Sequence, residues 1–240
     1  MVSVPRSRNR FYLVMACAGA VIAVTGFSRR YFLPLAHGTF EAPAIVHLHG
    51  IITFGWVAFV ILQTLLVMRL RKALHRSLGM AGIALATLLV YTATQIAILQ
   101  LARGLNDGAP SPREFAATVL SLPFMITGLF SFAIANVAKP EIHKRLMLLA
   151  SFVVLTPALA RIIQLLAPSM SRLMRNDLAG VASDTLVLVA IICDVKTRGK
   201  PHPTYLIAGG CMLLVQAVVL LGRKTTLWFG ITDWLASLVS

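Results

Sequence analysis

The feature that most constrains the fold of this chain is a series of long runs without Asp, Glu, Lys or Arg. Five such runs occur, at residues 11–28, 42–68, 77–102, 115–138 and 201–222. Each is close to or longer than the roughly 20 residues with which an α-helix crosses the hydrocarbon core of a bilayer. Because backbone polar groups have no partner in lipid, runs of this kind must be helical if they span a membrane.

Two further apolar segments are interrupted by single charges. Residues 146–166 contain Arg161, and residues 178–195 contain Asp184 and Asp194. Only 12% of all residues are charged, whereas soluble domains have about 25%. The sequence therefore predicts an all-α, polytopic membrane protein with seven transmembrane helices, arranged as a first helix followed by three hairpins.

The distribution of basic residues predicts the orientation of these helices. With the amino terminus inside, the inner segments hold thirteen basic residues and two acids, and the outer segments hold nine basic residues and six acids. Positive residues accumulate on the inner side of a membrane, so we expect the amino terminus inside and the carboxyl terminus outside. Lys144 and Arg145 are interpreted as two of the inner charges that fix this topology.

The net charge of +14 comes from short basic clusters at the ends of the apolar runs. Such clusters lie next to anionic headgroups, so we expect membrane lipids as partners and no nucleic acid. No linker divides the chain, which predicts one transmembrane domain over residues 1–240. Its tail, residues 225–240, contains Asp233 between Trp228 and Trp234. The tail is too short for another span and is predicted to be a short helix in the outer membrane interface.

Three histidines recur where helices are predicted to leave the inner surface. They are His75 in LHRSLG, His143 in IHKRLM and His202 in PHPTYL, and Asp194 lies at the same depth. Three imidazoles and a carboxylate form a ligand set for a transition metal such as zinc, iron or copper. Two of the imidazoles can instead bind haem b from opposite sides. Histidines beside Lys or Arg at helix ends are also typical interfacial anchors, and the sequence leaves these interpretations open.

A second set of polar residues follows one face of the segment at residues 42–68. His49, Trp56 and Gln63 are spaced by seven residues, which places them on one side of a helix. Lipid offers His and Gln no hydrogen-bond partner, so we expect this face to point into the bundle.

Other spans add polar groups to this interior, namely Gln95, Arg161 and Asp184. Charged residues inside a membrane are costly and are functional candidates by default. One interpretation is a cavity or a quinone-like cofactor site lined by His49, Trp56, Gln63, Gln95, Arg161 and Asp184. The other is structural: Arg161 and Asp184 form an ion pair, and the glutamines bond one helix to the next. The sequence does not decide between the two.

Two short motifs carry a family resemblance. LHRSLGM at 74–80 and IHKRLMLLA at 142–150 resemble the HRRLG and HKRLM helix starts of small, mostly uncharacterised bacterial seven-helix membrane families. Some members of these families are implicated in maturing haem–copper terminal oxidases. The resemblance implies a multi-pass protein of the bacterial inner (plasma) membrane that handles haem, copper or quinone. PHPTYL departs from the pattern and leaves the role of His202 in doubt.

Three functional hypotheses follow. The first is a protein that binds haem or a metal and supports respiratory electron transfer or oxidase assembly. The second is a small-molecule or lipid transporter that uses the polar face of residues 42–68 with Arg161 and Asp184. The third is a packing subunit of a respiratory or other membrane complex. The sequence contains no GxSxG, HExxH or phosphate-binding glycine loop, so no enzymatic activity is assigned.

Overall fold

The structure is a computed structural model that describes residues 6–239, and the regular structure of those residues is entirely helical. Residues 1–5 and 240, which the predicted domain includes, lie outside the described residues. Seven helical stretches are long and apolar enough to cross a membrane. The predicted all-α class and the seven apolar spans are therefore confirmed.

The order of elements follows the predicted pattern of one helix, three hairpins and a tail helix, with η1 and α2 added between the first helix and the first hairpin. The elements are α1 (Arg6–Phe27), η1 (Ser28–Phe32), α2 (Leu33–Ala36), α3 (Ala44–Met68), α4 (Lys72–Asn106), α5 (Pro112–Ala135), α6 (Pro140–Leu166), α7 (Arg172–Arg198), α8 (Pro203–Gly222) and α9 (Thr226–Ser237). Several helices extend beyond the uncharged runs, because Lys and Arg are good helix formers and continue a helix past its apolar part.

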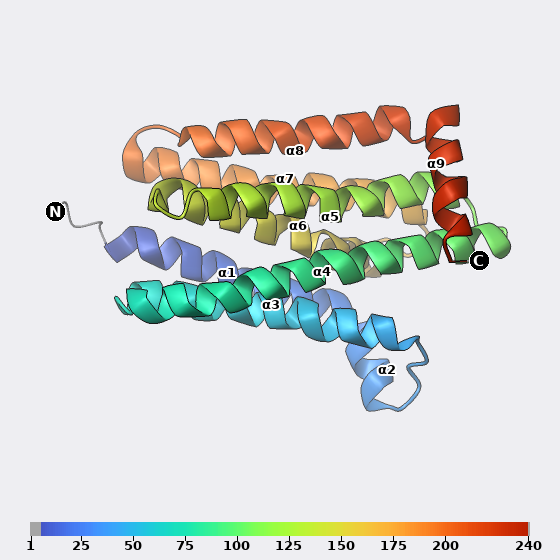
Figure 1. Ribbon diagram of the computed structural model, residues 1–240, viewed down its shortest axis with the longest axis horizontal. Coiled ribbons are helices and arrows are strands. Elements are labelled where there is room, and N and C mark those ends of the chain that lie inside the picture. Colours follow the sequence, from blue (N-terminus) through green and yellow to red (C-terminus); the bar gives the residue numbers. More distant parts are fainter. Residues whose placement is uncertain (1–5, 240) are drawn as a thin grey trace.

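The long helices lie side by side in a bundle with α5 and α6 in its middle (Figure 1). The α6 helix is the most enclosed, with 56% of its most apolar stretch buried. The loops at 69–71, 136–139 and 199–202 lie at the end of the bundle where the chain begins, which we call the N side. The loop at 107–111 and the helix α9 lie at the opposite end, which we call the C side (Figure 1). The assignment of the N side to the inside of a membrane remains a prediction.

The α1 helix packs directly on α6 near the C side. A Cβ atom built on Gly26 would lie 2.5 Å from the backbone oxygen of Ala158. Real Cβ atoms do not approach so closely, so a residue with a side chain would push the helices apart. Gly26 therefore sets the distance between α1 and α6 at Ala158, one turn before the half-buried Arg161 of α6.

The predicted tail forms a helix, α9, that crosses the C side of the bundle (Figure 1). An ion pair of 2.7 Å joins Asp233 to Arg113 at the start of α5. The indole of Trp228 donates a hydrogen bond of 2.7 Å to the backbone oxygen of Arg113. These contacts hold α9 against the bundle, and its place in a membrane interface remains a prediction.

Candidate anion-binding site

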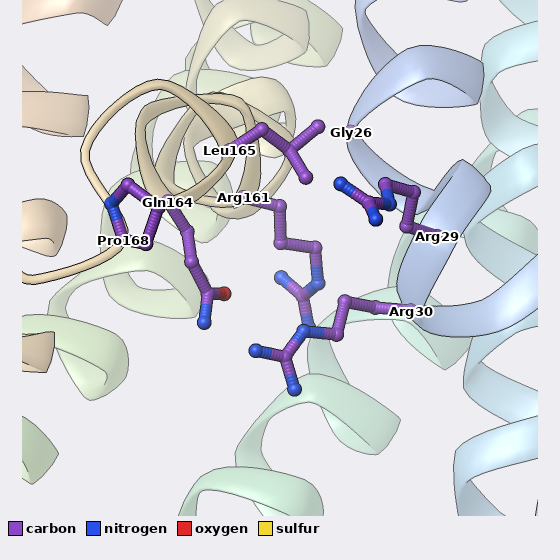
Figure 2. Close-up of a pocket in the computed structure, with 7 residues that line it drawn as sticks. All are labelled: Gly26, Arg29, Arg30, Arg161, Gln164, Leu165 and Pro168. Atoms are coloured by element: carbon purple, nitrogen blue, oxygen red, sulfur yellow. The ribbon is translucent and has the colours of Figure 1, made fainter.

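A cavity of about 400 Å³ lies at the C side between the end of α1 and the end of α6. Figure 2 shows the side chains of Arg29 and Arg30 entering it from one wall and those of Arg161 and Gln164 from the other. The lining residues are Gly26, Arg29, Arg30, Arg161, Gln164, Leu165 and Pro168. This volume falls in the range of small-ligand sites, and we call it the arginine cavity.

A change of helix type places two of the three arginines. After Phe27 the chain leaves the α-helical path and makes one turn of π-helix, η1, which contains Arg29 and Arg30. Short π-helical turns are rare and occur often at functional sites. The wider turn directs both side chains toward α6, as seen in Figure 2.

Arg161 is held in a fixed position by its own helix and by an aromatic ring. Its Nη1 donates a hydrogen bond of 2.9 Å to the backbone oxygen of Pro157. Its guanidinium lies over the ring of Phe27, 4.2 Å from the centroid. A cation over an aromatic face is stabilised electrostatically. The side chain is therefore pre-oriented, with most of its N–H donors still directed at the cavity.

Among the residues that the structure describes, no acid neutralises the positive charge of the arginine cavity. Among the ion pairs of the described residues, none involves Arg29, Arg30 or Arg161. Arg30 and Arg172 lie close enough to Arg161 to repel it. Guanidinium groups bind carboxylates and phosphates through paired hydrogen bonds. The arrangement can therefore hold an anion, which would relieve the mutual repulsion of the arginines.

The structural alternative for Arg161, an ion pair with Asp184, does not form. Asp184 lies further along the bundle on α7 and accepts a hydrogen bond of 3.2 Å from the amide of Gln216 on α8. The two charges are thus directed at different neighbours. Their occurrence in adjacent predicted spans gave no information on which way each side chain points.

The polar face of α3 points into the bundle, as predicted, but does not line the arginine cavity. His49 Nδ1 is 2.9 Å from the hydroxyl of Thr92 on α4. Trp56 is 1% exposed and meets Phe130 of α5 edge-on. Gln63 has both amide atoms buried without a hydrogen-bond partner. Gln95 is half-buried on α4. The predicted six-residue site is therefore distributed along the helix interfaces, and only Arg161 belongs to the cavity.

Asp194, a predicted metal ligand, is engaged by an arginine. Arg145 Nε donates to Asp194 Oδ2 over 2.9 Å, and its Nη2 donates to Oδ1 over 2.7 Å. The Arg145 side chain is fully buried and also pairs with Glu141 at 2.8 Å. Arg145 thus links α6 to α7 inside the bundle, and its interpretation as an inner topological charge stays a prediction.

The three histidines of the predicted metal site all lie at helix starts on the N side but have different contacts. His75 and His143 are each the fourth residue of their helix, whereas His202 precedes α8 and caps it. His143 Nδ1 donates to the backbone oxygen of Ala133 over 2.8 Å, and His75 Nδ1 is buried without a partner.

The four predicted metal ligands do not converge. Within residues 10–239, no group of three or more His, Cys, Asp or Glu side chains lies together so that it could hold a metal ion. Asp194 is taken by Arg145, and His202 Nδ1 accepts a hydrogen bond of 3.2 Å from the backbone N–H of Thr204. Burial and the positive charges of Arg145 and Arg198 lower the pKa of His202, which favours the neutral ring that accepts this bond.

The sequence interpretation missed Arg29 and Arg30 as site residues. They were counted only among the nine basic residues of the outer segments. No acid lies within ten residues of either arginine, since the nearest acid in the sequence is Glu41, and this lack of a local partner was the available signal.

Comparisons with models of protein families, with curated proteins and with solved structures gave no significant match. The site is therefore interpreted from its own chemistry.

Proposed function

We propose that this protein binds an anionic ligand in the arginine cavity, as the recognition step of a small-molecule or lipid transporter in the bacterial inner membrane. The observation that carries the proposal is the set of three arginines around one cavity of about 400 Å³ without an acidic partner among the described residues. Arg161 matters most, because it lies inside a helix long and apolar enough to span a membrane.

The energetics support a ligand with negative charge. A charged side chain at the centre of a membrane is unfavourable by about 2.5–3.5 kcal/mol or more unless it is paired or solvated, and part of this cost applies to Arg161 near the end of α6. The cation–π contact with Phe27 and the hydrogen bond to Pro157 offset only part of this cost. A bound phosphate or carboxylate would supply the missing charge and accept the unused N–H donors of the arginines.

Three acids, Asp177, Asp184 and Asp233, have partners outside the arginine cavity. Asp177 forms a two-point ion pair with Arg223, with oxygen–nitrogen distances of 2.8 and 3.0 Å. Asp233 pairs with Arg113, and Asp184 accepts from Gln216. Arg113 and Arg223 outside the cavity thus have acidic partners, while the arginines of the cavity have none among the described residues, and this contrast favours a ligand site over a structural cluster.

A binding measurement tests the proposal. The purified protein in mild detergent is titrated with inorganic phosphate, a short-chain carboxylate and an anionic lipid, with thermal stability as the readout, since a ligand that binds the folded state raises its stability. We expect at least one of the three to stabilise the protein, and Arg161→Gln to weaken that effect about tenfold or more.

Arg103→Gln is the matched control, because Arg103 is an exposed C-side arginine outside the cavity. Equal stabilisation of wild type and Arg161→Gln by every anion would overturn the proposal. The haem or metal hypothesis has its own test, an absorption spectrum of oxidised and reduced protein with elemental analysis of the same sample. A Soret band or stoichiometric metal would direct attention to His75 and His143.

A further inference from the structure

We infer that the anion of the arginine cavity is the phosphate monoester headgroup of a membrane lipid, which enters from the side of the bundle with its acyl chains left in the bilayer. This inference rests on the proposed function and names its ligand class. It is carried by the position of the cavity, by its size and by its surplus of donors.

The wall of the arginine cavity is shared with the lipid-facing surface. Leu165 lines the cavity and is 37% exposed, and the adjacent Leu166 is 81% exposed. Exposed apolar side chains on a helix that spans a membrane contact lipid chains. A ligand bound to Arg161 therefore lies directly beside the region that acyl chains occupy, and a soluble anion would leave this apolar wall without a partner.

The size of the cavity fits a headgroup and excludes a whole lipid. About 400 Å³ is at the low end of the range for sites that enclose a drug-sized molecule. A phosphate with its glycerol fits this volume, whereas two acyl chains do not. The chains must then extend over Leu165 and Leu166, which is where the exposed apolar surface lies.

The number of donors favours a phosphate monoester over a carboxylate or a phosphodiester. Each guanidinium has five N–H donors, and only one donor of Arg161 is used, in its bond to Pro157. The amide of Gln164 adds two more on the same wall. A phosphate monoester offers three oxygens and about −1.5 to −2 charges, while a carboxylate offers two oxygens and one charge. Three arginines are matched best by the more highly charged group.

The experiment compares lipids and free phosphate on the same protein. Dissociation constants are measured in detergent at 150 mM salt for phosphatidate, phosphatidylglycerol, oleate and inorganic phosphate, using wild type, Arg161→Gln, Arg103→Gln and Leu166→Asn. We expect phosphatidate to bind at least tenfold more tightly than the other three. Arg161→Gln should lose that preference, and Arg103→Gln should keep it.

Leu166→Asn separates the lipid inference from the proposed function, because Leu166 is exposed beside the cavity and does not line it. It should weaken phosphatidate about threefold or more and leave inorganic phosphate unchanged, because it alters the adjoining apolar surface and keeps the cavity. If inorganic phosphate binds as tightly as phosphatidate and Leu166→Asn changes neither, the ligand is a soluble anion, and the proposed function stands while the lipid inference fails. If no anion distinguishes wild type from Arg161→Gln, both fail.

Discussion

Arg145 of α6 and Asp194 of α7 form a two-point ion pair inside the N side of the bundle, with both bonds at or below 2.9 Å. The Arg145 guanidinium also lies over the ring of Tyr205 of α8, 5.4 Å from its centroid. One fully buried side chain thus connects three helices. A buried charge of this kind is stabilised only as long as its partner remains.

The first prediction concerns this pair. Asp194→Ala should destabilise the protein by about 3–5 kcal/mol, because it leaves the buried guanidinium of Arg145 without its main partner. The double variant Arg145→Met, Asp194→Leu should be more stable than Asp194→Ala, since it removes both charges and fills the space. Thermal unfolding in detergent measures both. If Asp194→Ala is as stable as wild type, Glu141 alone is a sufficient partner for Arg145.

The second prediction concerns the contact between α1 and α6. Gly26→Ala should cost about 1–3 kcal/mol, because the new methyl group would lie 2.5 Å from the oxygen of Ala158 and force the helices apart. Gly210→Ala is the control, since no atom lies within 4 Å of its added Cβ. There, the better helix propensity of alanine should stabilise the protein by up to about 1 kcal/mol.

The same Gly26 variant probes the arginine cavity. A wider separation of α1 and α6 changes the spacing of Arg29 and Arg30 relative to Arg161, so anion binding should weaken more than in Gly210→Ala. If Gly26→Ala is destabilised but binds anions as tightly as Gly210→Ala, the packing of α1 on α6 does not determine the geometry of the cavity.

The third prediction is a pH dependence that originates at His202. Its pKa is lowered in the folded protein below the usual value of about 6.5. The unfolded chain therefore takes up the proton first, so the folded state should keep its full stability above about pH 6.5 and lose stability as the pH falls below it. Protonation also removes the acceptor that caps α8 through the N–H of Thr204.

Two substitutions isolate this effect in unfolding curves between pH 5 and 8. His202→Asn should keep the cap, because Asn is a favourable N-cap residue, and should reduce the pH dependence. His202→Ala should lose about 0.5–2 kcal/mol at neutral pH with the cap. An unaltered pH profile in His202→Asn would assign the acid sensitivity to another group.

The helices were predictable from the sequence because uncharged runs identify spans directly, and α3 turns His49, Trp56 and Gln63 inward as their spacing of seven requires. Partner choice was not predictable. Asp194 was predicted to be a metal ligand, and its actual partner Arg145, which lies 49 residues away in the sequence, was assigned to topology. Charge patterns report which residues need a partner, and only packing of the helices determines which partner they meet.

The arginine cavity shows the same limit. Arg161 was identified because a charge inside an apolar run is conspicuous. Arg29 and Arg30 were not, because their entry into the cavity depends on the π-helical turn η1 and on the close approach at Gly26. Neither feature has a sequence pattern that hydropathy or charge counting detects.

The last prediction concerns the membrane contact of α9. Leu227, Ile231, Trp234 and Leu238 are all exposed and recur at the spacing of one helical face. If this face lies in the membrane interface, the fluorescence of Trp234 should be quenched by lipids brominated near the headgroup and less by lipids brominated at the chain ends. The signal of Trp234 is the difference between wild type and Trp234→Phe in the same liposomes. Quenching that is equal in the two proteins would place this face of α9 in water or against another protein.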